Sequence, residues 1–377
     1  MTFEEMRAQF PSAAGSIHLN HAGVSPISLA VGTAVHAVLG DLTGSDVLSG
    51  YMAHLERQED LRRALGRMAG AAGDTLGFVR NTSHGLAIAA EAIPFREGDS
   101  VVLPAIEYPA NVYPWMAQAR RGVTTRLVPA DANGVMAEDD LIAACDATTR
   151  VLAVSWVQWG SGQRLDVTKL GAFCRSRGIL FVVDLVQGLG ALRINLSDLP
   201  VDIAAAGCHK WLLAPGGLGV LYVHPEVFPT LLPTNIGWNS VESSLEWERP
   251  HFDELKRNPS RFEEGTSSLL ATAALNASVG VLEAVGFDAV HERVLALADH
   301  ARRALKARGL TVISPDGASQ RSGIVAFRHR TLPNEVVLQQ LEDKKVRAAV
   351  RCGNVRFAPH AYNSEADIAA AVAAIPV

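Results

Sequence analysis

Short apolar runs alternate with helical stretches from about residue 81 to residue 223. Five of these runs are bounded by Gly, Asp or Pro: DSVVLPA, TTRLVPA, TRVLAVSWV, GILFVVDLV and GLGVLYV. Runs rich in β-branched and aliphatic residues are typical of strands that helices cover on both faces. The alternation therefore predicts an α/β fold with a mainly parallel sheet, helices on its faces and right-handed connections.

Helical patterns fill the intervals between these runs and continue beyond the last of them. Residues 168–178 and 104–122 are predicted crossover helices. Residues 269–286 and 288–309 predict two further helices, and the second carries basic residues just before a glycine, which is typical of a helix end. Residues 236–268 are too polar for a core and too aromatic for a disordered segment, so we interpret them as a functional loop.

The C-terminal part has the pattern of a small α+β unit. Its predicted strands are LTVISP, SGIVAFRH and VRAAVR, and its last helix is predicted to begin at Ser364, with Asp367 completing a capping box. We divide the chain into an N-terminal segment that packs on the small domain, a large domain and a small C-terminal domain: residues 1–15, 16–285 and 286–377.

The composition is that of a folded soluble protein. Of the 377 residues, 48% are hydrophobic and 19% are charged, and the formal net charge of -5 gives no electrostatic reason to expect nucleic acid. No window approaches the roughly 20 apolar residues that a membrane helix needs, and the first residues lack the order of a signal peptide. We expect small-molecule partners, no membrane and a cytoplasmic location.

The spacing of cysteine and histidine indicates neither a disulfide framework nor a metal site. The cysteines at positions 145, 174, 208 and 352 are scattered without a CxxC pair, so we expect them to be reduced. The histidines show no HExxH or similar spacing, so we expect no bound metal.

An acid and an amine follow two of the apolar strands. Asp184 ends the run ILFVVD, and His209 and Lys210 follow a second apolar strand in GCHKWLLAPGG. Because ligands of α/β sheets bind at the carboxyl ends of strands, these side chains are expected to converge. A half-buried lysine beside an acid is the pairing that pyridoxal phosphate (PLP) needs, since its aldehyde forms a Schiff base with lysine and its pyridinium nitrogen takes an anionic partner. The alternative for Asp184 is a cap of the next helix.

A helix start that can receive a phosphate precedes these strands. The segment VRNTSHGLAIAAEAI offers Asn81, Thr82 and Ser83 as cap and first-turn donors, and Gly85 for close approach. An ordinary N-cap has the same pattern. A phosphate-binding protein without catalysis is a further alternative, but the chain has neither GxxxxGK[ST] nor a Rossmann glycine set.

Six motifs follow one another along nearly the whole chain: NTSHG, EYPAN, DLVQ, GCHKWLLAPGGLGVLYV, FEEGTSS and VRFAPHAYN. In this order they resemble the class V aminotransferase family, the fold-type I PLP enzymes that include cysteine desulfurases, kynureninase and isopenicillin N epimerase-like proteins. The resemblance implies a large PLP-binding domain with a sheet covered by helices, and a smaller C-terminal α+β domain.

The resemblance implies a cofactor site around Lys210. In this family the lysine forms the Schiff base and later shuttles protons, Asp184 would keep the pyridine nitrogen protonated, and Gln187 would hydrogen-bond the ring hydroxyl. Tyr108 would lie over the ring where desulfurases carry histidine, which favours the epimerase-like and kynureninase-like branches. The residue pattern alone also allows Tyr108 to be a strand-end aromatic packed in the core.

The resemblance also implies phosphate contacts for Thr82, Ser83 and His209. Thr266 resembles a threonine that reaches the phosphate of the neighbouring subunit, so a homodimer is implied as well. Gly207 stands where many relatives have a phosphate-binding serine, and Ser83 is our candidate for replacing that contact.

Substrate contacts are implied at several separate places. Arg356 matches the family arginine whose guanidinium binds the substrate carboxylate, a task that lysine serves poorly, and its alternative is a surface strand arginine. The weaker candidates share a polar or aromatic side chain near the expected substrate mouth: Asn20, Gln158, Trp238, Asn239 and His360.

The reaction type stays open at this point. A desulfurase carries a mobile nucleophilic cysteine on a loop before the carboxylate-binding arginine, but here Cys352 lies only four residues before Arg356. We therefore expect a PLP-dependent enzyme that acts on an amino acid as a C–S lyase or an aminotransferase. The alternatives are an isopenicillin N epimerase-like reaction, a cysteine desulfurase and a non-catalytic PLP-fold binding protein.

Overall fold

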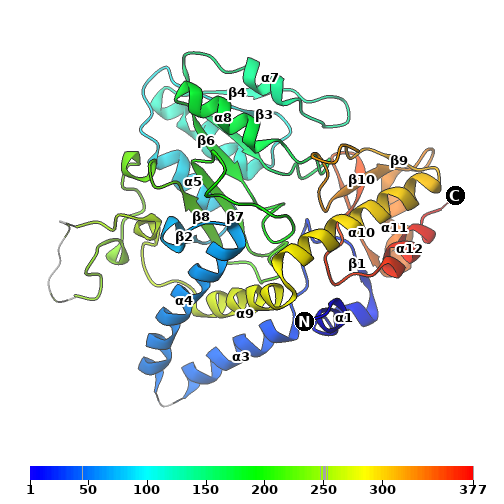
Figure 1. The fold of residues 1–377 in the computed structure, drawn as a ribbon, viewed down its shortest axis with the longest axis horizontal. Coiled ribbons are helices and arrows are strands. Elements are labelled where there is room, and N and C mark those ends of the chain that lie inside the picture. The colour runs from blue at the N-terminus through cyan, green and yellow to red at the C-terminus, as the bar shows by residue number, and fades with distance from the viewer. Residues whose placement is uncertain (45, 247, 249–251, 253, 377) are drawn as a thin grey trace.

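A seven-stranded sheet forms the centre of the larger part of the molecule (Figure 1). The computed structural model describes residues 1–44, 46–246, 248, 252 and 254–376. The strand order is β2-β8-β7-β6-β5-β3-β4; β8 is antiparallel to β2 and β7, whereas the other pairings are parallel. The strands are β2 (Leu76–Val79), β3 (Ser100–Pro104), β4 (Thr124–Val128), β5 (Thr149–Ser155), β6 (Leu180–Asp184), β7 (Ile203–Gly207) and β8 (Gly219–Val223).

Each of the five predicted runs supplies one strand of this sheet, and the mainly parallel α/β architecture is confirmed. Strand β2 was not predicted, because its four residues give too short a pattern to stand out from the helix before it. It pairs with β8 at one edge of the sheet, and its end leads directly into the helix start with the NTSHG motif.

The two faces of the sheet are covered by different helices. Along β5, Val151 and Ala153 pack in the cluster that contains α5, whereas Leu152 and Val154 pack in the cluster that contains α8. This alternation is the strand period of two, and it assigns each residue at the strand ends to a face. The helices of this part are α5 (Thr82–Ala92), α6 (Tyr113–Met116), α7 (Glu138–Ala143) and α8 (Val167–Arg177).

Three long helices lie below the sheet in the view of Figure 1, where α9 packs against both α3 and α4. Helix α9 then bends into α10, which leads to the small C-terminal unit. Both of these helices agree with the sequence prediction, whereas α3 and α4 were not predicted. The four helices are α3 (Leu29–Thr43), α4 (Val47–Ala69), α9 (Leu269–Val285) and α10 (Phe287–Ala307).

The small C-terminal unit is an antiparallel four-stranded sheet packed against helices, on the right of Figure 1. Its strand order is β12-β13-β10-β9, and its last helix has the predicted capping box at Ser364 and Asp367. Its elements are β9 (Thr311–Val312), β10 (Val325–Arg328), α11 (Asn334–Asp343), β11 (Val346–Arg347), β12 (Ala349–Arg351), β13 (Asn354–Phe357) and α12 (Glu365–Ala373).

The N-terminal segment packs on this small unit. Arg7 forms an ion pair with Asp367 at 2.6 Å, and the ring of Phe10 stacks on Tyr362. The short helices of this segment are α1 (Phe3–Ala8) and α2 (Ser12–Gly15). Strand β1 (Ile17–His18) then pairs with β11, so contact with the small unit continues beyond residue 15, the boundary that we drew from the sequence.

Two segments differ from their predicted form. The predicted strand VRAAVR is split between β11 and β12, which belong to different sheets, and β13 was not predicted. Residues 104–122 contain only short helical turns among the described elements, because Pro109 and Pro114 interrupt a regular helix. The stretch 236–268 is largely irregular where the structure describes it, and residues 247, 249–251 and 253 lie outside the described residues.

Within the described part of the chain, no single helix is both long and apolar enough to cross a membrane. Helices α9 and α10 are long and apolar enough only when they are taken together, and the chain bends by 81° between them.

Candidate active site

The predicted acid and amine meet in one cavity at the carboxyl ends of the parallel strands. This cavity, which we call the Lys210 cavity, has a volume of about 240 Å³. It contains eight of the residues that the sequence singled out: Thr82, Ser83, Tyr108, Asp184, Gln187, His209, Lys210 and Arg356. It is also lined by Ala22, Gly23, Asn81, Ala110, Trp159, Val186 and Arg351.

Asp184 and Lys210 perturb each other inside this cavity. Burial raises the pKa of the Asp184 carboxyl, the backbone N–H of Val186 opposes this by donating to it at 2.8 Å, and the nearby Glu107 raises it further. Burial lowers the pKa of the Lys210 amine, and the charge of Asp184 opposes that shift. A buried amine with a lowered pKa next to an acid is suited to covalent attachment of an aldehyde and to proton transfer.

The lysine is held by the segment after β7 and by the N-terminal part of the chain. Ser25 donates its hydroxyl to the carbonyl of Lys210 at 2.6 Å, and its backbone N–H donates to the carbonyl of His209 at 3.0 Å. The amide of Gln187 donates to the carbonyl of Ala22 at 3.0 Å and accepts from the indole N–H of Trp211 at 3.1 Å. Gln187 therefore lines the cavity and also holds Ala22 in position. Its contact with the ring hydroxyl of PLP stays a prediction.

The start of α5 forms the polar end of the cavity. Asn81 caps this helix by accepting from the backbone N–H of His84 at 2.9 Å, so its first N–H groups face the cavity side. A Cβ on Gly207 would lie only 3.1 Å from the hydroxyl oxygen of Thr82 and 3.3 Å from the ring of His209. A side chain at position 207 would therefore be crowded by Thr82 and His209, and the replacement of the lost contact by Ser83, which also lines the cavity, stays a prediction.

Two aromatic rings, those of Tyr108 and Trp159, line the cavity beside Lys210. The Lys210 amine lies 5.6 Å from the ring centroid of Tyr108, and Tyr108 meets Trp159 edge-on with their centroids 5.4 Å apart. The indole N–H of Trp159 donates to the carbonyl of Ile106 at 3.0 Å, which fixes its orientation. Tyr108 is 46% exposed, so the alternative that it packs in the core does not hold.

Arg356 is the large cation of the cavity and is almost completely buried, at 1% exposure. Its Nη1 donates to the carbonyl of Trp159 at 2.6 Å and its Nη2 to the side-chain oxygen of Asn20 at 3.2 Å. Its Nε has no hydrogen-bond partner among the described residues, and burial lowers the pKa of the guanidinium to about 10. A buried guanidinium with an unused N–H and no acid beside it fits a carboxylate ligand, and the alternative of a surface arginine does not hold.

Sequence reasoning missed Glu107 and Arg351. Glu107 is buried and accepts from the backbone N–H of Ser155 at 2.6 Å, from the Ser155 hydroxyl and from the Gln158 amide at 2.8 Å. Glu107 follows β3 much as Asp184 ends β6, so the same sequence pattern, an acid at the end of an apolar strand, could have identified it. In the EYPAN motif, however, only Tyr108 was predicted to be a site residue. Arg351 ends β12 and lines the cavity beside Arg356.

Two predicted substrate residues lie outside the Lys210 cavity. Gln158 is buried, with its amide nitrogen on Glu107, so it supports the wall rather than facing a ligand. His360 is also buried: its Nε2 bonds to the carbonyl of Trp211 at 3.1 Å and its Nδ1 accepts from the backbone N–H of Ala361 at 2.8 Å. Burial lowers the pKa of His360 to about 4, so it is a neutral structural histidine and not part of a substrate mouth.

Three further predicted residues gather in a different cavity of this chain. Trp238, Asn239 and Thr266 line a space of about 160 Å³ between α4 and the segment before α9. Asn239 accepts from the amine of Lys256 at 3.0 Å, and Thr266 is exposed. Within one chain none of the three lines the Lys210 cavity.

The residues of the Lys210 cavity fit PLP. The lysine can attach its aldehyde, the acid can pair with its ring nitrogen, and the start of α5 with Thr82 can receive its phosphate. Arg356 lines the same cavity with no acid beside it, so its guanidinium is a candidate for binding a substrate carboxylate there.

Comparisons with known proteins agree with this fit. The family model of class-V aminotransferases matches residues 21–368. A probable cysteine desulfurase of Methanothermobacter thermautotrophicus is 28% identical over 98% of this chain and 96% of its own. An uncharacterized aminotransferase of Bacillus subtilis, YcbU, is 26% identical over 84% of this chain and 83% of its own.

Solved structures show the same fold. The cystine C-S lyase C-DES, in complex with its reaction product cysteine persulfide, superposes with a TM-score of 0.89 at 24% identity, over 97% of this chain and 98% of its own. The apo cysteine desulfurase of Thermococcus onnurineus NA1 gives a TM-score of 0.85 at 24% identity, over 97% of this chain and 95% of its own. The chain belongs to the class-V aminotransferase family and is a PLP-dependent enzyme.

Proposed function

We propose that this enzyme is a C–S lyase that cleaves the Cβ–S bond of a sulfur-containing amino acid without help from a protein thiol. The observation that carries the proposal is the position of Cys352. The names of its relatives support the substrate class, because they refer to cysteine and to cystine.

Cys352 lies on a tight turn that joins β12 to β13. The turn consists of Cys352 and Gly353, with positive φ angles of 50° and 71°, the backbone of a two-residue type I′ hairpin. The sulfur packs over Gly160, 2.7 Å from the place that a Cβ on this glycine would take. Cys352 is exposed as a residue, but the partial burial of its sulfur raises the pKa of the thiol. A thiol on so short a turn, mostly protonated, is poorly suited to travel to a substrate and accept its sulfur.

Arg356 is the proposed carboxylate-binding residue. Its two Nη atoms are held by the Trp159 carbonyl and by Asn20, so the guanidinium is oriented before a ligand arrives. Its guanidinium can then bind a substrate carboxylate, with Arg351 at the same wall adding positive charge.

Lys210 and Asp184 supply the proton chemistry. When it is bound, PLP supplies the electron sink that allows the Cα–H bond to break. The lowered pKa of the Lys210 amine suits it to take the Cα proton, and Asp184 holds a positive charge on the ring nitrogen. Tyr108 and Trp159 line one side of the cavity in which these groups lie.

With cystine as the substrate, the reaction balances without a further reactant except water. The Cα proton goes to Lys210, and the Cβ–S bond breaks so that its electron pair leaves with the sulfur. Addition of one water to the remaining three-carbon fragment gives pyruvate and ammonia, and the sulfur leaves as cysteine persulfide.

We also propose that the enzyme acts as a homodimer. The helices α3 and α4 expose apolar side chains, among them Leu39, Leu48 and Met52, of which Leu48 is 71% exposed. Thr266 is exposed and lies apart from the Lys210 cavity of its own chain. A second copy that covers α3 and α4 is consistent with both features.

The test is to incubate the PLP-loaded protein with cystine, cysteine or alanine, and to measure pyruvate, ammonia and persulfide sulfur in the small-molecule fraction. We expect equal amounts of pyruvate and ammonia from cystine, with persulfide sulfur in solution rather than on the protein. The variant Cys352→Ser is expected to keep this activity.

Three outcomes would contradict the proposal in different ways. Sulfur that accumulates on Cys352 would establish a desulfurase, and loss of activity in Cys352→Ser would agree with it. If alanine converts the cofactor to its amine form and cystine releases no sulfur, the enzyme is an aminotransferase. Exchange of the Cα proton without any product would favour a racemase or epimerase.

A further inference from the structure

Glu107 is a buried acid that the proposed reaction does not use. It follows β3, directly precedes Tyr108 in the chain and is only 6% exposed. Among the described residues it forms no ion pair, and a buried carboxylate without a cation is costly. Burial raises its pKa, and hydrogen bonds from Ser155 and Gln158 oppose this shift without cancelling it. The position of this carboxyl therefore needs a reason other than packing.

The hydrogen bonds of Glu107 join two segments that are far apart in the sequence. Its Oε1 accepts from the backbone N–H of Ser155 at 2.6 Å and from the amide of Gln158 at 2.8 Å, and its Oε2 accepts from the hydroxyl of Ser155. Because the carboxylate is planar and both of its oxygens are used, these contacts fix the position and the rotation of the group. Glu107 thus ties the turn after β3 to the end of β5 and to the residues that follow it.

The two segments that Glu107 joins also carry the aromatic wall of the Lys210 cavity. Tyr108 follows Glu107 in the chain, and Trp159 follows Gln158. The indole N–H of Trp159 donates to the carbonyl of Ile106 at 3.0 Å, and the rings of Tyr108 and Trp159 meet edge-on. The contacts of the carboxylate therefore lie at the base of both rings, and the relative position of the two rings depends on them.

The same connection extends to two charged residues of the cavity. Nη1 of Arg356 donates to the carbonyl of Trp159 at 2.6 Å, so the guanidinium is held by the segment that Glu107 fixes. Ser155 is the register partner of Asp184 where β5 pairs with β6. A shift of the segment after β5 would therefore move the arginine and the aromatic rings together, next to the strand end that carries the acid.

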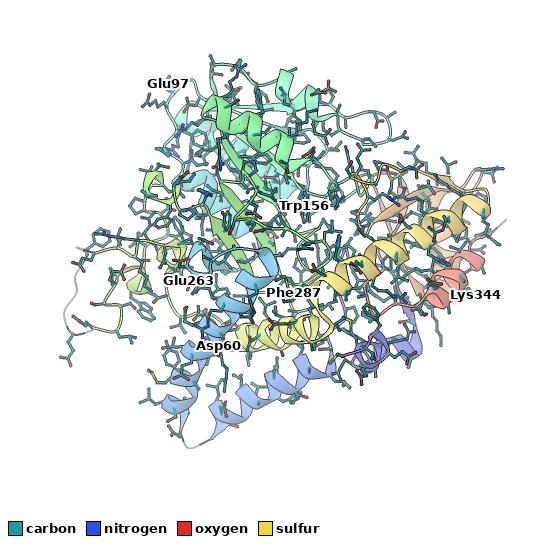
Figure 2. The ribbon with its side chains drawn as sticks, in the orientation of Figure 1. Asp60, Glu97, Trp156, Glu263, Phe287 and Lys344 are labelled. Atoms are coloured by element: carbon teal, nitrogen blue, oxygen red, sulfur yellow. The ribbon has the colours of Figure 1, made fainter. Side chains whose placement is uncertain are left out.

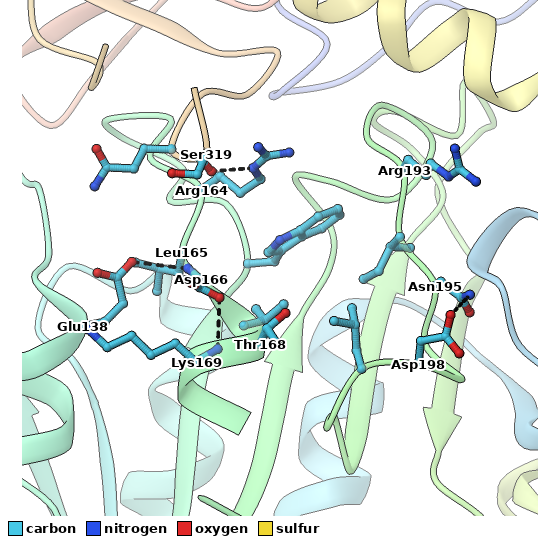
Figure 3. Close-up of a pocket in the computed structure, with 15 residues that line it drawn as sticks. Glu138, Arg164, Leu165, Asp166, Thr168, Lys169, Arg193, Asn195, Asp198 and Ser319 are labelled. Atoms are coloured by element: carbon cyan, nitrogen blue, oxygen red, sulfur yellow. Dashed lines mark hydrogen bonds between the residues drawn. The ribbon is translucent and has the colours of Figure 1, made fainter. Parts of the chain in front are cut away.

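The contacts of Glu107 act on one face of the sheet only. Trp156 follows Ser155 in the chain, but its side chain packs in the cluster with α8, and Figure 2 shows it between the central sheet and the small C-terminal unit. It lines a separate cavity, shown in Figure 3, where Arg164 donates to the carbonyl of Ser319 at 2.8 Å. Glu107 is not part of that lining. Its contacts therefore concern the wall of the Lys210 cavity.

We propose that Glu107 is a positioning residue of this enzyme: its carboxylate holds Tyr108 and Trp159 in place beside the cofactor. Through the Trp159 carbonyl it also holds Arg356 in place for the substrate carboxylate. Glu107 does not itself line the Lys210 cavity, so it acts through these neighbours. Its effect on turnover rests on the proposed lyase reaction, whereas its effect on the surroundings of the bound cofactor does not.

The experiment compares the PLP-loaded protein with its variants Glu107→Ala and Glu107→Gln. Alanine removes every acceptor of the group, whereas glutamine keeps one oxygen for the two N–H donors and can donate its amide to the Ser155 hydroxyl. The first readout is the visible circular dichroism per bound cofactor, without substrate. PLP is achiral, so this signal arises from its asymmetric surroundings, and a loss of stability alone does not change it while the protein is folded.

In Glu107→Ala we expect this signal to fall about twofold or more and kcat/KM for cystine to fall about 10- to 100-fold. Glu107→Gln should keep both values within about threefold of the unaltered enzyme. The matched control is Asp202→Ala, because Asp202 accepts from the backbone N–H of Phe181 at 2.7 Å and ties β6 to β7 at their amino ends, away from the cavity. It should lower the unfolding midpoint but leave the signal and kcat/KM within about twofold.

The outcomes separate this role from the proposed function. An unchanged signal in folded Glu107→Ala, or an equal loss in Asp202→Ala, would overturn the inference and leave the lyase proposal intact. If thermal scans show that Glu107→Ala does not fold, Gln158→Leu decides, because it removes one donor to Glu107 and keeps the volume: a weaker signal supports the role and an unchanged signal overturns it. Absence of lyase activity in every protein would contradict the proposed function, while the cofactor signal would still test Glu107.

Discussion

The Lys210 cavity differs in size and in charge from a second cavity, which we call the Trp156 cavity and which is lined by Trp156, Arg164 and the start of α8. The Lys210 cavity is the smaller, about 240 Å³ against about 590 Å³, but it holds the coupled acid and amine and the buried Arg356. In the Trp156 cavity Lys169 and Arg193 each pair with an acid near the surface. The larger cavity is therefore not the one that holds the perturbed acid and amine, and the perturbed pKa values rather than volume mark the candidate reaction site.

The two cavities are also separated by the strand period. Ser155 and Asp184 end β5 and β6 on the face of α5, whereas Trp156 turns to the face of α8. A one-residue step along the chain thus separates the face of the Lys210 cavity from the face of the Trp156 cavity. The four predictions below test whether this division holds.

The largest effect is expected for Lys210→Ala. Removal of the amine takes away both the attachment of the cofactor and the proton carrier, so lyase turnover should fall by about 1,000-fold or more. The absorbance band of the lysine-bound cofactor should disappear, which is checked on the purified protein after addition of PLP. Turnover within tenfold of the unaltered enzyme would remove Lys210 from the mechanism.

The next effect is expected for Arg356→Gln. Glutamine cannot supply a charged N–H to the substrate carboxylate, so kcat/KM for cystine should fall by about 100-fold, mainly through KM. Steady-state kinetics measure this, and Arg351→Gln at the same wall is the matched control, with a smaller expected loss. Equal losses in both variants would show that the wall acts by charge alone.

A smaller, pH-dependent effect is expected for Glu107→Gln. Burial raises the pKa of both Glu107 and Asp184, and the charge of Glu107 adds to the shift of Asp184. A carboxyl whose folded pKa exceeds its unfolded value, near 4, costs stability as the pH rises through the interval between the two. Glu107→Gln removes one of these two carboxyls. Because it also removes the charge of Glu107, it lowers the pKa of Asp184.

Its unfolding midpoint should therefore fall less than that of the unaltered protein as the pH rises from about 4.5 to 7.5. Thermal scans of the PLP-free protein measure this. The variant Asp139→Asn, at an exposed acid whose side chain is 80% accessible, should follow the unaltered protein. A parallel fall in all three would mean that Glu107 does not contribute to the pH dependence.

The smallest effect on turnover is expected for Trp156→Phe. The change removes the indole N–H and part of the fused ring that packs on Gly188, which costs stability. Because this side chain lies on the face of the sheet opposite the Lys210 cavity, lyase kcat should stay within about twofold. Steady-state assays of the PLP-loaded enzyme check this. A large loss of kcat would show that the two cavities act as one functional unit.

Much of the Lys210 cavity could be predicted because its residues follow strands. Asp184 and Lys210 each come after an apolar run, and the topology of a parallel sheet brings such positions to one edge. The helix start at Thr82 and the capping box at Ser364 are likewise local patterns that a few residues specify.

Only the tertiary structure decided the rest. The partners of Gln158 and His360 are residues distant in sequence, so their burial as structural groups has no local signal. Glu107 becomes a neighbour of Asp184 only when β3, β5 and β6 pair, and the close approach of Thr82 to Gly207 joins two elements that are separate in the sequence. The sequence by itself determined which residues can carry the chemistry, because residue type and strand position are local properties. The structure determined which of them meet, because distance and desolvation are set by packing between segments far apart in the chain.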